Sequence, residues 1–402
     1  MSHRPFALSP DLKKLCNEGY DLEIRSDHLL VKDVPYVNSQ RQVQRGILVM
    51  PLSLAGDITA QPKDHVAHFA GDYPCKVDGS AMEHIRNQSG ERTLAPGVVV
   101  QHSFSAKPMP KGNYDNYYDK VTTYVRILSG PAWSIDSTAT AQTFPVIKAE
   151  TANDDDPFNY IDTASSRAEI GMVKQKLSGQ KIGIVGLGGT GSYVLDYVAK
   201  TPVAEIHLWD GDTFLQHNAF RSPGAATLEA LREKLPKTTY LKNLYSNMHR
   251  GIVDHPVHID AGNVEELRSM DFVFITMDSG PAKKIIIEAL LKFGVPFVDA
   301  GMGIHLHDQS LAGNIRVSIC TDRKQDHLSS RICFADGAGP NEYDQNIQIA
   351  ELNALNAALA VIRWKKHLTF YRDFKREHNT IYSIDTGLLL NEDFPDDPEN
   401  KS

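Results

Sequence analysis

The feature that most constrains the fold is KIGIVGLGGTGS, residues 181–192, in which a short apolar run ends in a cluster of glycines. Gly186, Gly188 and Gly191 have the spacing of a dinucleotide-binding fingerprint, and Gly189 is an additional glycine. Loops of this kind join a buried strand to a helix and bring backbone amides close to phosphate groups. The segment therefore predicts a nucleotide-binding strand, turn and helix, but the glycines alone do not distinguish NAD(P) from ATP.

The segments beyond this loop are predicted to alternate between strand and helix. Apolar runs rich in β-branched residues recur, and helical patterns separate several of them. Strands that read as continuous apolar runs are buried on both faces, so the pattern favours an α/β fold, a Rossmann-like domain with a mostly parallel sheet. The predicted strands lie at 181–186, 205–210, 256–260, 271–278, 295–301 and 313–319, and the predicted helices at 190–200, 280–294 and 346–366.

An acidic segment at 149–159 divides the chain, which at 402 residues is long enough for two domains. The segment contains a proline and few apolar residues, which is typical of a linker. We expect an N-terminal domain at 1–148, a second domain at 160–390 and an acidic tail at 391–402. In the first domain, a short helix, four strand-like runs, an irregular stretch and a later helix near 114–129 predict a smaller α+β fold.

Composition argues against several classes of protein. A net charge of −8 and the lack of a basic run argue against a nucleic-acid partner. The longest apolar stretch, 46–56, contains a proline and is too short to span a membrane, and the N-terminus lacks the apolar core of a signal peptide. Scattered cysteines without a CxxC pair predict a cytoplasmic protein with no zinc site; they are Cys16, Cys75, Cys320 and Cys333.

Polar residues beyond the glycine loop favour ATP over NAD(P). Asp210 ends the second predicted strand, where a carboxylate binds ribose hydroxyls, and Asp212 follows it. Arg221, with Asn218 beside it, and Lys237 supply groups that suit phosphate oxygens, whereas hydride transfer has no use for such an arginine. These residues predict a site for a nucleoside triphosphate.

Asp278 is the predicted metal ligand. It ends another predicted parallel strand, at the edge of a doubly wound sheet that faces the ligand. A carboxylate among phosphates and cations is best explained by a magnesium ion. His305, His307 and Asp308, by contrast, lie on a predicted strand as an H-x-H-D run and are interpreted as a surface face.

The ordered set of motifs resembles the ThiF/MoeB/ubiquitin-activating-enzyme superfamily. The match consists of the glycine loop, the D-x-D at 210–212, the N-x-x-R at 218–221, Lys237, and the D-S and VPFVDAG sequences that follow. It extends over residues 160–390. The resemblance implies an adenylyltransferase that uses ATP and Mg²⁺ to activate the C-terminal carboxylate of a small ubiquitin-like, β-grasp protein, as a homodimer and with a conjugating enzyme as a possible further partner.

The resemblance also implies residue roles. Asp210 would bind the ribose, Asn218, Arg221 and Lys237 the phosphates, and Asp278 the magnesium ion. Arg167 matches an arginine that reaches into the partner subunit's site. Ser222 replaces the glutamine of the usual N-x-x-R-Q motif, so the contacts at this position are expected to differ from those of the family. Alternatives that stay open are a sulfur-carrier adenylyltransferase for cofactor biosynthesis, an NAD(P)-dependent oxidoreductase, and a scaffold without activity.

The N-terminal domain resembles a ubiquitin-conjugating (UBC-like) fold in the order of its elements and in the DYP sequence at 72–74. A recognition or dimerisation domain without chemistry is the alternative. No cysteine occurs at 76–150, where that family carries its nucleophile.

The residue that receives the activated carboxylate is therefore open. Cys333 is the first candidate, because a thiolate is the usual acceptor. Ser103 or Ser105, assisted by His102, is the alternative and would form an oxyester; Cys75 is a further candidate.

Overall fold

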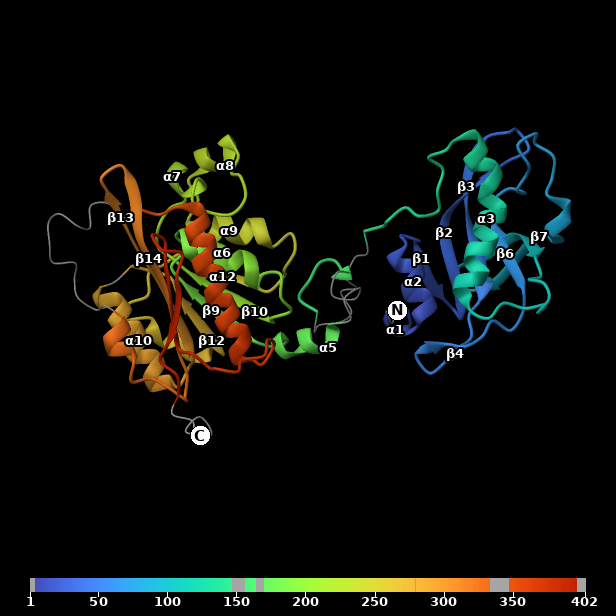
Figure 1. Ribbon diagram of the computed structural model, residues 1–402. Coiled ribbons are helices and arrows are strands. Elements are labelled where there is room, and N and C mark those ends of the chain that lie inside the picture. Colours follow the sequence, from blue (N-terminus) through green and yellow to red (C-terminus); the bar gives the residue numbers. More distant parts are fainter. Residues whose placement is uncertain (1–3, 147–155, 164–169, 279, 333–346, 396–402) are drawn as a thin grey trace. The chain divides into compact units, whose positions relative to one another are not determined.

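The computed structural model describes residues 4–146, 156–163, 170–278, 280–332 and 347–395. These residues belong to two compact units, which are treated separately below (Figure 1). The N-terminal unit is formed mainly by 4–146, and the C-terminal unit by 156–161 and the residues from 170 onward. Within the described ranges, none of the helices combines the length and the apolar character needed to cross a membrane.

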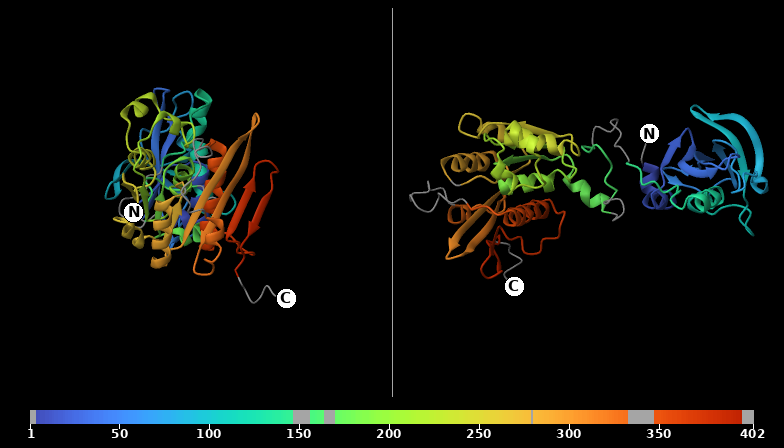
Figure 2. Two further views of the ribbon diagram at one scale, coloured as in Figure 1. Left: turned by 90° about the vertical axis from the view of Figure 1, so that its left-hand side faces the viewer. Right: turned by 90° about the horizontal axis from the view of Figure 1, so that it is seen from above.

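The N-terminal unit is an antiparallel sheet covered by helix α3, Tyr117–Ile135. Six strands of the described residues pair in the order β1-β2-β3-β6-β8-β7, and the long β7–β8 hairpin is visibly curved (Figure 2). The strands are β1 Leu22–Arg25, β2 His28–Val37, β3 Val43–Pro51, β6 Val66–Ala70, β7 Arg86–Ala95 and β8 Val98–Ser105; two short helices, α1 Arg4–Leu8 and α2 Pro10–Asn17, precede them, and a ribbon of β4 Leu54–Ala55 and β5 Ile58–Thr59 lies between β3 and β6.

The core of this unit lies between the sheet and the buried face of α3. Tyr117, Val121, Tyr124 and Leu128 recur at helical spacing and pack on Phe104 and other strand residues. The predicted α+β order is confirmed by this arrangement. The predicted irregular stretch was wrong in part, because β7 lies within it; its residues are mainly polar and exposed, so no apolar alternation marks the strand. The resemblance to conjugating enzymes stays a prediction.

The C-terminal unit is built on one twisted sheet with a parallel part and an antiparallel part. The described strands follow the order β11-β10-β9-β12-β13-β14-β15-β16. The first five pair in parallel and the last three antiparallel. Their bounds are β9 Lys181–Val185, β10 Glu205–Trp209, β11 Ile252–His255, β12 Phe272–Ile275, β13 Phe297–His307, β14 Ser310–Cys320, β15 Asn379–Ser383 and β16 Leu389–Glu392.

Helices cover both faces of this sheet, which confirms the predicted Rossmann-like architecture. One apolar cluster joins the sheet to α6 and α12, and the other joins the opposite face to α10. β9 lies between β10 and β12, so the chain changes direction at the glycine loop, the place where doubly wound folds bind ligands. The helices are α5 Gly171–Lys174, α6 Gly189–Val198, α7 Gln216–Ala219, α8 Leu228–Glu233, α9 Lys237–Tyr245, α10 Pro281–Phe293, α11 Leu328–Arg331 and α12 Ala350–His367.

The predicted strand at 256–260 was wrong in position. The structure has β11 at Ile252–His255, in register with Ile206–Trp209 of β10. Pro256 follows β11 directly and lacks the amide hydrogen that a further ladder bond requires. Val257 and Ile259 alternate with polar residues as in a strand, which is why the sequence predicted the strand at 256–260.

The last residues of the predicted linker pack on the C-terminal unit. Phe158 is buried and forms an isolated β-bridge with His249. The Asn159 amide donates to the Met248 carbonyl at 2.9 Å, and the Arg250 amide donates to the Pro157 carbonyl at 2.7 Å. Residues 157–159 therefore belong to the C-terminal unit, to which they are joined by backbone hydrogen bonds.

A buried ion cluster lies where the parallel and antiparallel parts of the C-terminal sheet meet, since Asp299 pairs with Ile275 of β12 and with Ser318 of β14. Asp299 on β13 is fully buried; its Oδ1 lies 2.8 Å from Nζ of Lys283 at the start of α10, and its Oδ2 lies 2.5 Å from Nη2 of Arg316 on β14. Lys283 is buried as well. Burial raises the pKa of Asp299, and the two cations more than offset that effect, so the pKa lies below its usual value.

Candidate functional site

The glycine loop has a backbone that only glycine can form at two positions. Gly186 has φ +88°, in the left-handed region, and its Cα faces the backbone of Met277, where a Cβ would lie 3.0 Å from the Met277 nitrogen. A Cβ on Gly191 would collide with the Gly186 carbonyl oxygen. Gly188 caps α6, and Gly189 begins it. The loop therefore turns tightly and presents the N-terminus of α6, an arrangement that binds anions.

Gly191→Ala is expected to destabilise the C-terminal unit by about 1–3 kcal/mol, since backbone atoms cannot move aside as a flexible side chain can. The displaced loop should also lose ATP binding. Thermal unfolding with and without ATP measures both effects, because a bound ligand raises the unfolding temperature. Gly171→Ala is the matched control, since a Cβ there would meet no atom within 4 Å. Equal ATP-dependent stabilisation in Gly191→Ala and wild type would contradict this account of the loop.

Asp210 joins the loop to the end of β10. Its Oδ2 accepts a hydrogen bond from the Leu187 amide at 2.6 Å, and its Oδ1 accepts one from the Asp212 amide at 2.8 Å. Asp210 is buried, and a buried lysine, Lys237, lies opposite it with Nζ 3.5 Å from Asp210 Oδ1. The carboxylate therefore shapes the loop while its charge is balanced by a cation.

Lys237, the first residue of α9, connects the two aspartates. Its Nζ donates to Asp212 Oδ2 at 2.6 Å, and its backbone amide donates to the Asp212 carbonyl at 2.9 Å. The hydrogen bond from Lys237 lowers the pKa of Asp212, and the charges of His258 and Arg221 lower it further. The structure thus brings together the D-x-D, Lys237 and Arg221, which the sequence places in separate segments.

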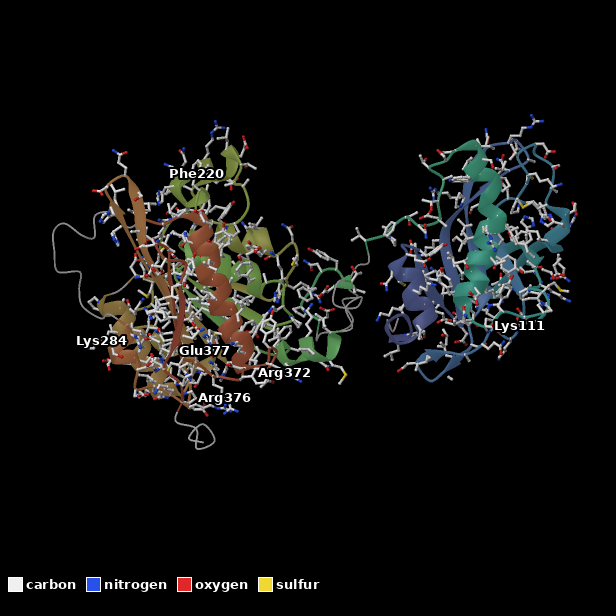
Figure 3. The ribbon with its side chains drawn as sticks, in the orientation of Figure 1. Lys111, Phe220, Lys284, Arg372, Arg376 and Glu377 are labelled. Atoms are coloured by element: carbon white, nitrogen blue, oxygen red, sulfur yellow. The ribbon has the colours of Figure 1, made fainter. Side chains whose placement is uncertain are left out.

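Asn218 and Arg221 lie just beyond the D-x-D, in and after the short helix α7. Asn218 is buried; its Oδ1 accepts from the Leu215 amide at 2.8 Å, whereas its Nδ2 has no hydrogen-bond partner among the described residues. Nε of Arg221 is likewise buried without a partner in those residues. Ser222, at the glutamine position of the motif, is buried. Phe220, which directly precedes Arg221, is exposed (Figure 3 labels it). Buried donors without acceptors are costly, and an anionic ligand would satisfy them.

Asp278 is exposed and comes one residue after Met277, the residue that faces Gly186. β12 ends at Ile275, so Asp278 follows the strand by three residues and does not end it as predicted. Its neighbour Met277 contacts Gly186 of the glycine loop, and the role of Asp278 as a metal ligand stays a prediction. The described residues contain no group of three or more His, Cys, Asp or Glu side chains arranged to bind a metal. A single carboxylate fits Mg²⁺ when substrate phosphates and water complete the octahedron.

Three side chains at this site escaped the sequence analysis. Asn353 of α12 is fully buried; its Oδ1 accepts from Thr190 Oγ1 at 3.0 Å, and its Nδ2 has no partner among the described residues. Gln348 Oε1 accepts from the Gly189 amide at 3.3 Å. His258 Nδ1 accepts from the Gly211 amide at 3.4 Å, next to Asp212. They come from distant segments without a motif, so no local signal identifies them.

Two predicted site residues, Arg167 and Cys333, lie outside the described residues. Three other cysteines are free thiols, and burial raises the pKa of each: that of Cys16 to about 11, that of Cys320 to about 12, and that of Cys75 above its ordinary value. A raised pKa keeps these groups protonated at neutral pH, which makes them poor nucleophiles. His305 and His307 on β13 are exposed, as predicted for a surface face.

The histidine expected to assist Ser103 or Ser105 has another partner. His102 Nδ1 lies 3.2 Å from Ser89 Oγ on β7. Ser103 Oγ instead accepts from Asn87 Nδ2 at 3.3 Å. Because neighbouring residues of a strand point to opposite faces, Ser103 and Ser105 both lie on the face of β8 opposite to His102. The predicted pairing with His102 was wrong.

Two protein-family models match the chain, one in each half. The ThiF family matches residues 164–387, and a domain of unknown function, DUF6791, matches residues 10–163. No match was found among curated proteins.

Solved structures give weaker likenesses. E. coli MccB with MccA-N7isoASN is 16% identical with a TM-score of 0.44, over 56% of this chain and 68% of MccB. SeMet PaaA is 18% identical with a TM-score of 0.43, over 55% of this chain and 75% of PaaA. E. coli MccB with ATP is 16% identical with a TM-score of 0.43, over 56% of this chain and 68% of MccB. The ThiF match covers more than half of the 402 residues and includes the glycine loop, the D-x-D and Lys237. The chain belongs to the ThiF family, whose adenylating enzymes bind ATP.

Proposed function

We propose that this chain uses ATP to adenylate the C-terminal carboxylate of a small ubiquitin-like protein, as the activating enzyme of a conjugation pathway. The observation that carries the proposal is the pair of buried donors without acceptors, Asn218 Nδ2 and Arg221 Nε, in the segment that follows the D-x-D. The charge of Arg221 acts on Asp212, the ion-pair partner of Lys237. An anion with several oxygens satisfies them, and a triphosphate is such an anion.

The reaction consists of one displacement. A carboxylate oxygen attacks the α-phosphorus of ATP, an oxygen–phosphorus bond forms, and the bond to the β-phosphate oxygen breaks to release pyrophosphate. Negative charge grows on the phosphate oxygens in the transition state. Fixed cations such as Arg221 and Lys237 stabilise that charge more than they stabilise bound ATP, and this difference accelerates the reaction.

The other proposed residues position the nucleotide. Asp210 is assigned to the ribose and the glycine loop to the phosphates, since the N-terminus of α6 favours negative charge. Asp278 would hold Mg²⁺, which neutralises phosphate oxygens when bound. A homodimer in which Arg167 completes the partner subunit's site remains a prediction from the family resemblance.

The nicotinamide alternative explains fewer residues. Bound NAD(P) could use Asp210 at the ribose and Arg221 at a phosphate, but hydride transfer gives no role to the predicted magnesium ligand, Asp278. A sulfur-carrier adenylyltransferase would use the same site and the same first step. Conjugation and sulfur-carrier activation differ in the nucleophile that later attacks the adenylate. Because each pathway has its own carrier protein, the identity of the protein substrate distinguishes them.

The test is ATP–pyrophosphate exchange by the full chain with β-grasp proteins that end in glycine, encoded beside it in its genome. Exchange should require Mg²⁺ and one cognate protein, and removal of that protein's final glycine should abolish it. A thiocarboxylate product would favour the sulfur-carrier alternative. Binding of NADH, seen as nicotinamide fluorescence, together with no exchange for any protein offered, would refute the proposal.

A further inference from the structure

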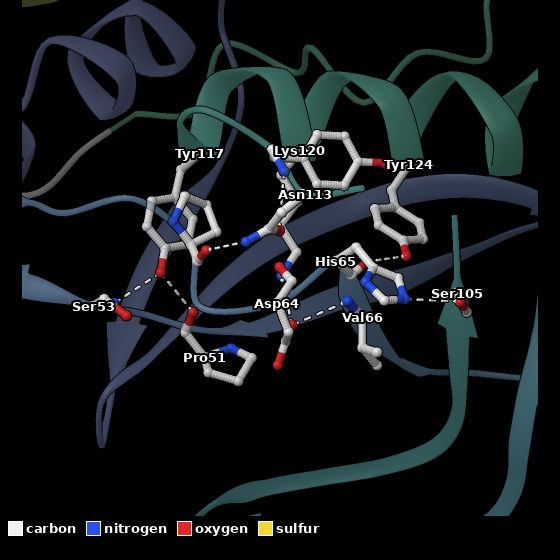
Figure 4. Close-up of polar contacts among 12 residues, drawn as sticks. Pro51, Ser53, Asp64, His65, Val66, Ser105, Asn113, Tyr117, Lys120 and Tyr124 are labelled. Atoms are coloured by element: carbon white, nitrogen blue, oxygen red, sulfur yellow. Dashed lines mark hydrogen bonds and ion pairs between the residues drawn. The ribbon is translucent and has the colours of Figure 1, made fainter. Parts of the chain in front are cut away.

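A serine and a histidine of the N-terminal unit form a close pair that the sequence analysis did not identify. Nε2 of His65, immediately before β6, lies 3.0 Å from Oγ of Ser105 at the end of β8 (Figure 4). The two strands are antiparallel, with Val66 opposite Ser105, so the pair bridges neighbouring strands. Both side chains are half-buried and keep contact with solvent. A hydroxyl and a ring nitrogen at this distance have the geometry of an activated nucleophile.

The backbone on both sides of this pair is tied to one phenol. Tyr124 of α3 is fully buried, and its hydroxyl accepts a hydrogen bond from the Ala106 amide at 2.9 Å. The same hydroxyl is 2.5 Å from the His65 carbonyl and 3.1 Å from the Phe104 carbonyl, to either of which it donates. The Tyr124 hydroxyl thus holds Ser105 through the backbone of its two neighbours, Phe104 and Ala106. It holds His65 through that residue's own carbonyl group. A single rigid group fixes the distance between nucleophile and base.

A buried lysine one helical turn earlier fixes the other side of His65. Lys120 has 1% of its surface exposed, and its Nζ donates to the Asp64 carbonyl at 3.0 Å and to Asp64 Oδ1 at 3.2 Å. The same Asp64 oxygen accepts from the Val66 amide at 3.0 Å. Burying an ammonium group costs several kcal/mol before pairing, so this is an expensive way to hold a strand end.

The surrounding charges keep the histidine ready to accept a proton. Partial burial lowers the pKa of His65; the charges of Lys107 and Lys120 lower it further, against an opposing effect of Asp64. The imidazole is therefore neutral at pH 7, the form that can remove a proton from a hydroxyl. The same lysines favour an anionic reactant near the pair.

We propose that Ser105 and His65 form a catalytic dyad that takes an acyl group from an acyl adenylate and holds it as an oxyester. The inference rests on the proposed function for its substrate, since an adenylating enzyme makes such a mixed anhydride. Tyr124 and Lys120 are positioning residues, because they hold the strands and touch no reacting atom.

The transfer step is balanced within these groups. Ser105 Oγ attacks the carbonyl carbon of the acyl adenylate, and its proton passes to His65 Nε2. An ester bond forms, the bond from carbonyl carbon to phosphate oxygen breaks, and AMP leaves as an anion. The proton on His65 is then lost to solvent. No oxidant, reductant or metal is consumed.

The same unit supplies a matched control. Ser89 and His102 form a second serine–histidine pair at 3.2 Å, also across neighbouring strands. Among the described residues, α3 makes no hydrogen bond to the backbone of Ser89 or His102. If proximity alone sufficed, both serines would be reactive. If positioning by Tyr124 and Lys120 is required, only Ser105 is reactive.

The experiment treats the full chain with acetyl adenylate and maps acetylation by mass spectrometry. We expect one acetyl ester on Ser105, resistant to reductant and removed by hydroxylamine. Ser105→Ala should abolish it, and His65→Asn should slow it by roughly 10²–10⁴-fold, the usual contribution of a general base. Ser105→Cys, which preserves the shape, should instead carry a thioester. Ser89→Ala should acetylate like wild type.

Supplying acetyl adenylate bypasses the C-terminal unit, so this result does not depend on ATP–pyrophosphate exchange. No ester on the wild-type chain, or ester formation on Ser89 or at scattered hydroxyls, would overturn the proposal. Acetylation of Ser105 by a chain that shows no exchange would support the dyad while refuting the proposed adenylation.

Discussion

Replacing Arg221 with alanine is expected to lower ATP–pyrophosphate exchange by roughly 10²–10³-fold, the usual loss when one preorganised donor to a transition-state anion is removed. The Arg221 Nε atom is buried and has no partner among the described residues, so the substitution removes no hydrogen bond of this atom within them. The free energy of unfolding should therefore change little. Exchange rates at saturating ATP, alongside thermal unfolding, measure the two quantities separately.

Arg232→Ala is the matched control for this prediction. Arg232 lies on α8, in the same connection between β10 and α9 as Arg221, but its side chain is 75% exposed. It pairs with the carboxylate of Glu229 at 3.8 Å. An exposed pair of this kind contributes at most about 1 kcal/mol, and its loss should leave exchange unchanged. Wild-type exchange by Arg221→Ala would show that Arg221 has no part in the reaction.

Replacing Asp299 with alanine is expected to lower the stability of the C-terminal unit by about 3–5 kcal/mol. The substitution removes the carboxylate that faces Lys283 at 2.8 Å, and Lys283 is too deeply buried to reach water. An ammonium group left unpaired in the core is far more costly than the loss of an attraction. Denaturant unfolding of the full chain, followed by fluorescence, measures the change, because Trp209 and Trp364 are buried in this unit.

The dependence on pH has a definite sign. The pKa of Asp299 is lower in the folded chain than its ordinary value. Its contribution to stability is therefore present above the ordinary aspartate pKa of about 4 and is lost as the pH falls through the lower, folded value.

Glu288→Ala provides the comparison on the same helix. Glu288 faces Lys284 at 3.9 Å, and both side chains are more than half exposed (Figure 3 labels Lys284). This substitution should change the free energy of unfolding by less than about 0.5 kcal/mol. Equal effects of Asp299→Ala and Glu288→Ala would mean that the buried cluster contributes no more than a surface pair.

Local patterns predicted most of the C-terminal fold. The strands around the glycine loop are short apolar runs, and burial on both faces makes such runs easy to recognise. β15 and β16 were missed because they are mixed in polarity and pair as an antiparallel hairpin at the sheet edge. β11 ends before Pro256, because proline lacks the amide hydrogen that a further ladder bond requires. The spacing of apolar residues does not contain this information, so the strand was predicted in the wrong place.

The site was predictable only where it follows a motif. The D-x-D, Lys237 and Arg221 occur at fixed points after strands, so the topology brings them together. Asn353 reaches the glycine loop and His258 reaches the D-x-D through the packing of distant segments, and an asparagine or histidine without a motif gives no sequence signal. His65 likewise has no motif with Ser105; the antiparallel register of β6 and β8 creates that pair.

The hydrogen bond between Thr190 and Asn353 joins two residues that are 163 positions apart in the chain. A ribosome adds about 5–20 residues each second, so roughly 10–30 seconds separate the synthesis of the glycine loop from that of the helix that packs on it. During that interval the nascent chain carries the loop while α6 lacks its apolar partner, α12. The N-terminal unit, by contrast, has its whole sheet and α3 before the loop is made. A completed nucleotide site is thus a late product of translation, formed only after α12 has been synthesised.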